Sequence, residues 1–247
     1  MILAIALGSR QNAVMASTPQ GARALARDQI TRDIKAIGRQ HLADYGAAAL
    51  SLRAVARDAG MVSSAVYRYF PSRDDLLTAL IVDAYDAVGA VAEKALDETR
   101  RRSTSSRWIG IAADFRAWAS AHQHEYALLY GSPVPGYAAP GDTISPAARV
   151  PLALLALLAD GVERGEIQTV TEIPTPRSVH SDFAAVRIAT AMEIPDAVLS
   201  RGLLAWAQLL GTVGLELFGH LHNVIHEYDA FFQLQMQRTG RYLENGD

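Results

Sequence analysis

The stretch LSLRAVARDAGMVSSAVYRYFPSR, from Leu50 to Arg73, decides the fold of this chain. Its first half has one apolar helix face at the i, i+3, i+4, i+7 spacing, formed by Leu52, Val55, Ala56 and Ala59. Ser51 stands where its side-chain oxygen can cap this helix, and Gly60 predicts the turn that ends it.

A second short helix is expected to begin at Ser63 and to be closed by Pro71, which lacks a backbone donor and disfavours a helical residue before it. The side chains expected to pack back on the first helix are Val66, Tyr69 and Phe70. The opposite face carries Ser63, Ser64, Tyr67 and Arg68. Two short helices joined by a glycine turn, with such an outer face, predict a helix-turn-helix.

Composition limits the class of protein. The 247 residues can form one large or two modest domains, and half of them are hydrophobic while a fifth are charged, as in soluble globular proteins. The absence of cysteine excludes disulfides and thiolate sites. The sequence has no apolar run of the roughly 20 residues that a membrane span needs, and its apolar start has no preceding positive charge. We expect a cytoplasmic protein with no membrane partner, whose translation starts nearer Met15.

Charge is distributed unevenly. Residues 1–78 hold ten Arg and Lys against six Asp and Glu, a balance of +4, and the remainder holds thirteen against twenty, a balance of -7. The basic end contains the helix-turn-helix. Because phosphate neutralisation supplies most sequence-independent affinity for DNA, this distribution favours a nucleic-acid partner.

The whole chain is expected to be all-α, since no strand pattern or internal repeat is visible. We expect a flexible arm over residues 1–22, a three-helix DNA-binding bundle over 23–72, and a larger helical effector-binding and dimerisation domain over 73–247. The arm's arginines either reach DNA or belong to a solvated tail. Helices are expected at about 22–45, 74–100, 104–121, 124–130, 146–163, 183–192, from 195 through 215, and 224–242.

The helix-turn-helix resembles the DNA-binding half of the TetR (tetracycline repressor-like) family over roughly residues 25–85. The matching segments are Leu52 to Ala56, Ala59 and Gly60, Val66 to Phe70, and Ser72 to Leu77. The resemblance implies a homodimer of nine- or ten-helix subunits, whose last two helices form a four-helix bundle with the partner's. It also implies a small-molecule pocket in the larger domain.

Roles of single residues follow from matching positions. The small side chains that would meet base edges in the major groove are Ser63, Ser64 and Ala65, and Arg53 can pair with guanine. Phosphate contacts are implied for Ser51, Tyr67, Tyr69 and Arg73, and Arg68 lies on the same face. For Tyr69 the alternative is a ring that is partly core.

The second half shows a weaker resemblance to a subgroup of TetR-like regulators marked by Trp, His and Gly, over Trp206 to Gly211 and on to His220. Leu210 stands where the histidine of that pattern is expected. The resemblance therefore implies a role of this helix in the dimer and no role for that histidine. The stretch over residues 202–215 has no charge and is expected to be covered by a second subunit. Expected interface residues are Leu203, Trp206, Leu210, Gly211, Gly214, Phe218 and Phe231.

An effector pocket is expected where aromatic and polar side chains gather near the helix that begins at Pro146. Its expected lining is Phe115, Trp118, His122, Tyr126, Tyr130 and Trp206. Because these helices carry few charges, the ligand is expected to be lipophilic or aromatic. The alternative for each residue is an ordinary place in the core.

No catalytic site, cofactor or metal site is expected. The spacing of His222 and His226 suits a metal only on one fixed helix, and the segment after His220 is expected to be a turn. His122 and His124 have a strand spacing on a helical stretch, and no GxSxG turn occurs. The sequence thus predicts a homodimeric regulator, most simply a repressor, that leaves a pseudo-palindromic operator when a small effector binds. Its alternatives are a helical adaptor with a vestigial helix-turn-helix and, less supported, an all-helical enzyme.

Overall fold

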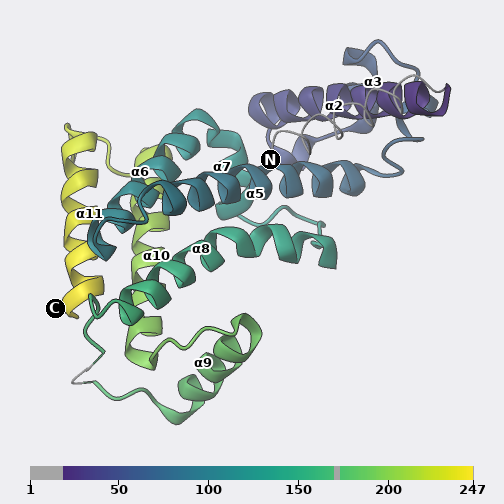
Figure 1. Ribbon diagram of the computed structural model, residues 1–247. Helices are drawn as coiled ribbons and strands as arrows, with labels where there is room; N and C mark the ends of the chain where they lie inside the picture. Colours follow the sequence, from purple (N-terminus) through teal and green to yellow (C-terminus); the bar gives the residue numbers. More distant parts are fainter. Residues whose placement is uncertain (1–18, 170–172, 247) are drawn as a thin grey trace, which may run out of the picture. The chain divides into compact units, whose positions relative to one another are not determined.

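The computed structural model describes residues 19–169 and 173–246, and every regular element among them is a helix (Figure 1). The all-α prediction is confirmed for this part of the chain. Most of the expected N-terminal arm lies outside the described residues, and its last residues belong to the first described helix, which begins at Pro19. The elements in order are α2 (Pro19–Tyr45), η1 (Ala47–Ala49), α3 (Leu52–Asp58), α4 (Ser63–Val66), α5 (Arg73–Glu98), α6 (Thr104–Ala121), α7 (Gln123–Tyr130), η2 (Gly141–Thr143), α8 (Ile144–Glu163), α9 (Arg177–Thr190), α10 (Asp196–Leu217) and α11 (Tyr228–Asn245).

The chain divides into two compact units. The first contains the chain up to Leu80 together with residues 134–137, and the second contains the rest. The division falls inside α5, whereas the sequence placed it at 72/73. The long loop after α7 returns to the first unit, where Tyr137 and Thr78 share a hydrogen bond of 2.9 Å between their hydroxyls.

The first unit is a small bundle of α2, α3, α4 and the start of α5, built around apolar side chains. Fully or almost fully buried are Ile34, Leu42, Leu52, Val55, Val66, Phe70, Leu76 and Leu77. Gly38 of α2 packs against Leu76 and Leu80, where a Cβ would lie 3.2 Å from the nearest side-chain carbon. The buried His41 joins α2 to α3 through a bond of 2.7 Å between its Nε2 and the Asp58 carboxylate.

Local details of the helix-turn-helix differ from expectation in two places. Ser51 occupies the N-cap of α3 with extended backbone, but its side chain makes no capping hydrogen bond, so the predicted cap is wrong. The second helix begins at Ser63 as predicted, yet ends already at Val66 and continues as turns through Tyr69. By contrast Ser72 caps α5 as predicted: its Oγ accepts from the Asp75 amide at 3.1 Å, while its own amide donates to that carboxylate at 2.8 Å.

The second unit is a helical bundle in which α6 packs against α11, α10 packs against α11 and α8, and α9 lies beside α10 (Figure 1). Its core centres on the buried aromatic side chains of Trp108, Phe115, Tyr126 and Phe232. Arg116 of α6 joins α10 and α11. It makes two hydrogen bonds of 2.7 and 2.8 Å to Glu216 of α10 and one of 2.8 Å to Asp229 of α11.

Three helices of this unit begin two or more residues away from the expected position. Helix α8 begins two residues earlier, α9 begins six residues earlier at Arg177, and α11 begins four residues later at Tyr228. Helix α8 is apolar nearly all round, yet it is only partly buried, since Leu152 is 40% exposed. By length and composition α8 and α10 are apolar enough to cross a membrane, but both contribute side chains to the core of this unit.

Candidate functional site

A turn with left-handed backbone presents the short helix α4. Gly60 has a φ of 64°, and the amide of Met61 donates across the turn to the carbonyl of Ala56 at 2.9 Å, which ends α3. This φ is costly for any residue with a Cβ, so glycine is required here. The turn and the buried Val66 fix the orientation of α4 against α3.

Most residues expected to contact DNA lie on one surface around α4, and their side chains have no bonding partner in the described chain. Exposed among them are Arg53, Ser64, Tyr67 and Arg68, while Ser51, Ser63 and Ala65 are partly exposed. Within the described chain none of their side chains makes a hydrogen bond or ion pair to another residue. Donors left free on a basic surface are available to phosphates and base edges. We name this set of seven residues the α4 surface.

Tyr69 combines the two roles that the sequence left open. Its ring is partly exposed, and the guanidinium carbon of Arg27 lies 5.0 Å from the ring centroid. Arg27 also donates to the carbonyl of Arg68 at 3.4 Å. For Arg27 the sequence left open a contact with DNA and a solvated tail; in the structure it contacts the turn after α4.

Arg73 differs from the α4 surface because it is used inside the unit. One guanidinium nitrogen donates to the carbonyls of Ala47 and Ala48 at 2.8 and 3.4 Å, and the other reaches the Asp74 carboxylate at 3.1 Å. These bonds fix η1 to the start of α5. A phosphate contact by Arg73 therefore has to coexist with these three partners.

Two features were missed in the sequence. Val62, the N-cap residue of α4, is 70% exposed, and an apolar residue directly before two serines at a glycine turn was the signal for it. The second is the bond between His41 and Asp58. It lowers the pKa of the Asp58 carboxyl below its usual value, and the neighbouring Arg57 adds to the effect.

The aromatic residues expected to line a pocket pack against one another. The ring of Phe115 lies 5.5 Å from that of Trp206 and 5.9 Å from that of Tyr130, while Trp118 stacks on His122 at 5.5 Å. The Tyr126 hydroxyl donates to the carbonyl of Leu210 at 2.8 Å, and burial raises its pKa to about 12. Burial also raises the pKa of Tyr130.

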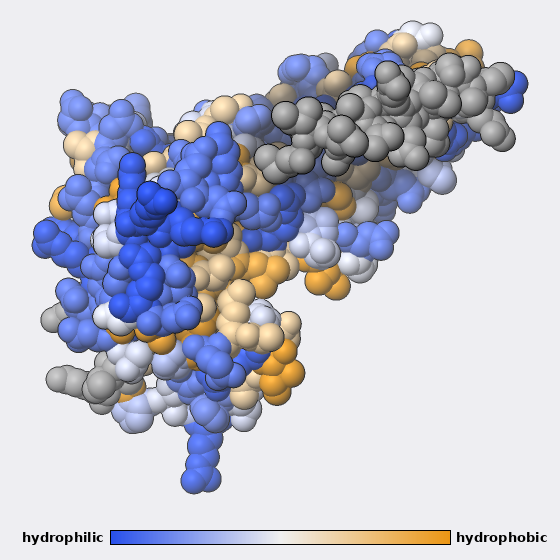
Figure 2. Space-filling model, viewed as in Figure 1, coloured by the Kyte–Doolittle hydropathy of each residue, from blue (hydrophilic) through white to orange (hydrophobic). Residues whose placement is uncertain are grey.

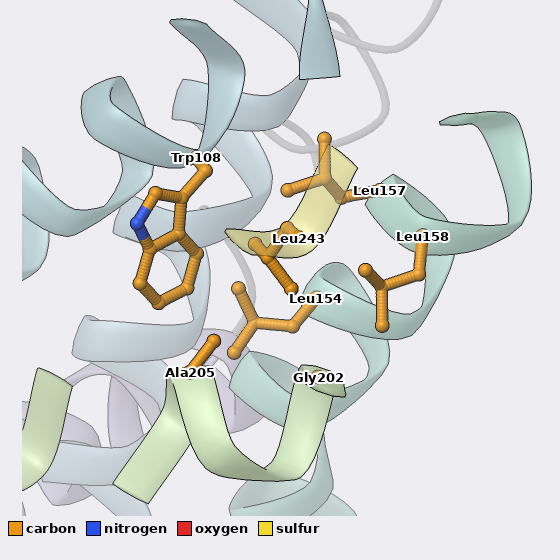
Figure 3. Close-up of a pocket in the computed structure, with 7 residues that line it drawn as sticks. All are labelled: Trp108, Leu154, Leu157, Leu158, Gly202, Ala205 and Leu243. Carbon is orange, nitrogen blue, oxygen red and sulfur yellow. The ribbon is translucent and has the colours of Figure 1, made fainter. Parts of the chain in front are cut away.

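A cavity of about 220 Å³ lies elsewhere in the second unit, between α8, α9 and α10. Of the six residues expected to line a pocket, only Trp206 borders this cavity. The other lining residues are Pro151, Leu154, Leu155, Leu158, Phe183, Val186, Leu199, Gly202 and Leu203. A second space of about 10 Å³ adjoins it, where leucines of α8 and α11 converge on the ring of Trp108 (Figure 3).

Apolar side chains are exposed along α10 and α11, where an interface with a second subunit was expected. Of the expected residues, Leu203, Gly211 and Phe218 are exposed, while Trp206, Leu210, Gly214 and Phe231 are partly buried. The sequence did not single out Leu204, Leu215 and Leu234, which are 55%, 45% and 44% exposed.

The histidines are dispersed. His220, His222 and His226 are exposed in the segment between α10 and α11, and Glu216 is occupied by Arg116. Among the residues that the structure describes, no group of three His, Asp or Glu is arranged to hold a metal ion.

Comparison with known proteins relates both units to one family. Residues 36–80 match the family model for bacterial regulatory proteins of the tetR family, and residues 108–239 match the model for the tetracyclin repressor-like C-terminal domain. The HTH-type transcriptional regulators Mb1846 of Mycobacterium bovis and Rv1816 of Mycobacterium tuberculosis are each 46% identical to this chain over 200 residues. That alignment covers 81% of this chain and 85% of each relative.

Solved structures share the fold. The crystal structure of SCO4313, a candidate regulatory protein, superposes with a TM-score of 0.71 at 31% identity, covering 90% of this chain and 98% of the other. The TetR family transcriptional regulator PfmR of Thermus thermophilus superposes with a TM-score of 0.54 at 15% identity, covering 85% and 96% of the two chains, which supports the fold alone.

Proposed function

The chain belongs to the TetR family of transcriptional regulators, and we propose from this premise that it is a homodimeric repressor that a small lipophilic molecule releases from a pseudo-palindromic operator. Membership in the family makes it a DNA-binding regulator. The dimer, the repression, the operator symmetry and the effector are our proposal.

The observation that carries the proposal is the free α4 surface. The polar side chains of this surface have no partner in the described chain, whereas Arg32, Arg57 and Arg73 of this unit bind a side-chain amide oxygen, a carboxylate and a backbone carbonyl. Leaving polar groups and positive charge unpaired favours an external partner, and duplex DNA matches both. In this proposal Arg53 reads guanine, while Ser51, Tyr67 and Tyr69 hold phosphates.

The exposed apolar residues of α10 and α11 support dimerisation. Leu203, Leu204 and Leu215 on α10, Phe218 directly after it and Leu234 on α11 are all more than two-fifths exposed. Large apolar patches on soluble proteins commonly mark interfaces. One copy of so short a recognition helix gives few base contacts. Two copies placed about 34 to 36 Å apart reach successive major grooves and add their specificity.

Release follows from a population shift. An effector that binds the second unit more tightly in one arrangement of the dimer favours that arrangement, and operator is lost if the two copies of α4 no longer fit successive grooves. Helix α5 begins in the first unit and ends in the second, so it is the continuous element that can transmit this change.

The test is binding of the purified protein to the DNA upstream of its own gene at two salt concentrations. We expect affinity to fall steeply with salt, and the double variant Tyr67→Ala, Arg68→Ala to lower both the affinity and the salt slope. A helical adaptor would show no salt-dependent DNA binding to lose. Unchanged affinity and slope in the double variant would remove the α4 surface from the proposal.

Dimerisation is tested separately by sedimentation of Leu204→Glu, Leu215→Glu. We expect this variant to be monomeric and to bind one half-site weakly, because it places charges in the apolar interface. Ile188→Glu is the matched control, since Ile188 is 83% exposed on α9 and should leave the dimer intact. Dimers that persist in the double variant contradict the assigned interface.

A further inference from the structure

We propose that the cavity between α8, α9 and α10 binds one uncharged, mostly hydrocarbon molecule with about the bulk of two fused aromatic rings. The binding site stands on the geometry of the second unit, while its role as the effector site rests on the proposed function. This cavity replaces the pocket that was expected around Phe115, because the aromatic rings there pack against one another.

The chemistry of the lining excludes charged ligands. All ten lining residues are apolar, and they come from α8, α9 and α10. Ordered water needs two to four polar partners, which this lining lacks, so the space favours apolar atoms over water. A charged ligand would lose its hydration and find no counter-ion.

Two basic side chains of α9 are already paired with a carboxylate at the start of α10. Arg187 and His180 of α9 both bind the carboxylate of Asp196 at the start of α10, each at 2.6 Å. Arg187 also donates to the carbonyl of Ile194 at 3.1 Å. These bonds attach α9 to α10 and leave the neutral side chains of Phe183 and Val186 to cover the cavity.

The cavity has a buried wall and a partly open rim, which favours a small molecule over a protein partner. Leu154, Leu158, Phe183 and Leu199 are each more than nine-tenths buried although they border it, and Leu203 is the exposed large residue of its rim. A second protein would contact exposed residues such as Leu203 and could not reach the space behind Phe183. Figure 2 shows hydrophobic surface gathered along α8 and the adjacent part of α9, which suits the approach of an apolar molecule.

The volume of the cavity and the freedom of its wall residues to move limit the size of the ligand. An engineered apolar cavity of about 150 Å³ stays dry and binds benzene, and the present cavity of about 220 Å³ is half as large again. Leu154, Leu158 and Gly202 form a wall shared with the 10 Å³ space in Figure 3, so the two leucines have room to adjust. The Gly202 side of this wall is close-packed, since a Cβ there would lie 2.4 Å from Cδ1 of Leu158.

The experiment measures binding of naphthalene and of its charged counterpart 2-naphthoate to the full-length protein by equilibrium dialysis, without DNA. We expect one naphthalene per chain and at least ten-fold weaker binding of 2-naphthoate. Val186→Phe fills the cavity and should weaken naphthalene binding at least ten-fold. Ile188→Phe, the same kind of enlargement on the exposed side of α9, should bind like the unsubstituted protein.

Leu199→Ala provides an opposite test that does not depend on loss of binding. It enlarges the cavity, so phenanthrene should bind this variant at least ten-fold more tightly than it binds the unsubstituted protein. Equal naphthalene binding by Val186→Phe and Ile188→Phe, equal binding of naphthalene and 2-naphthoate, or an unchanged size preference in Leu199→Ala would overturn the assignment. So would absence of naphthalene binding with loss of the dimer in Val186→Phe, which would assign this space to an interface between copies.

Operator release is measured separately, so that the two proposals fail in different ways. Cavity-dependent naphthalene binding without any change in operator affinity keeps the ligand site and contradicts its effector role. Release of operator by naphthalene that Val186→Phe leaves intact keeps the regulator and overturns this cavity.

Discussion

The arginines of the α4 surface and three arginines that join helices of the second unit have opposite roles. In the first unit Arg53 and Arg68 extend from the α4 surface without a described partner, whereas in the second unit Arg116, Arg149 and Arg201 are bound on several sides. Arg149 binds Glu93 and Asp86 of α5, and the buried Arg201 donates to the carbonyls of Tyr242 and Leu243. Free arginines suit binding to an external anion, and bound ones hold helices around a cavity that carries no charge.

The contrast predicts that removing a bound arginine affects folding, whereas removing a free one affects DNA binding. The largest expected effect is that of Arg116→Met, which leaves the mostly buried Glu216 without its partner. Removing one partner of a buried pair costs about 3 kcal/mol of unfolding free energy. Urea unfolding at fixed protein concentration measures it.

The matched control for this change is Asp229→Ala, because Asp229 binds the same guanidinium but is 91% exposed. It should cost under about 0.5 kcal/mol, as exposed ion pairs do. Equal losses from the two substitutions would show that burial of Glu216 does not determine the effect.

Arg53→Ala has the second largest expected effect, on operator affinity and not on stability. Loss of a guanine contact costs about 2 kcal/mol, or about thirty-fold in the dissociation constant. The unfolding free energy should stay unchanged, since Arg53 has no described partner. Fluorescence anisotropy with labelled operator and urea unfolding measure the two quantities.

Arg73→Ala is the counterpart in the same unit. Its guanidinium holds the carbonyls of Ala47 and Ala48, so we expect a loss of about 2 kcal/mol in stability. A well-folded Arg73→Ala protein that has lost operator affinity would instead support the phosphate contact implied by the family resemblance.

The same contrast explains what the sequence could predict. The helix-turn-helix depends on neighbours in sequence: the glycine turn, the spacing of Leu52, Val55 and Ala56, and the start at Ser63 were all visible. Helix α6 was predicted with its observed ends because Ile111, Phe115 and Trp118 keep one face and all become buried. The sequence could not reveal that Arg73 would fold back on η1, because its partners lie 25 and 26 residues away.

The cavity depends on distant residues and was not predictable. It exists because three helices meet without filling the space between them, with Gly202 allowing α10 to approach Leu158. The beginning of α9 was also missed, because residues 177–182 are mostly polar and give a weak apolar period. Conspicuous aromatic side chains were expected at the pocket, yet large rings are the side chains best able to fill a core.

Tyr126→Phe tests a single hydrogen bond in the core of the second unit, and its expected effect on stability is smaller than those above. The Tyr126 hydroxyl is buried and donates to the carbonyl of Leu210, so its loss should cost about 1 kcal/mol at pH 7. Its pKa is raised from 10.0 to about 12 in the folded protein, so its contribution is complete below pH 10 and is lost as pH rises toward 12.

Urea unfolding between pH 7 and pH 11 should therefore show the difference between the unsubstituted protein and Tyr126→Phe narrowing above pH 10. Tyr45→Phe is the control for removal of an exposed tyrosine hydroxyl, because Tyr45 is 66% exposed. A difference that stays constant to pH 11 would contradict burial as the cause.

The smallest expected effect is at Val62, the exposed apolar residue that directly precedes α4. In the major groove an apolar side chain recognises the methyl group of thymine, and burying one to two carbons is worth about 0.5 to 1 kcal/mol. Val62→Ala should thus weaken operator binding by about two- to five-fold and leave stability unchanged. Operators in which single thymines are replaced by uracil remove only the methyl group: the unsubstituted protein should bind one of them more weakly, and Val62→Ala should not distinguish it from the thymine operator. A Val62→Ala protein that still distinguishes every thymine from uracil would mean that another apolar side chain of the α4 surface, such as Ala65, contacts the methyl group.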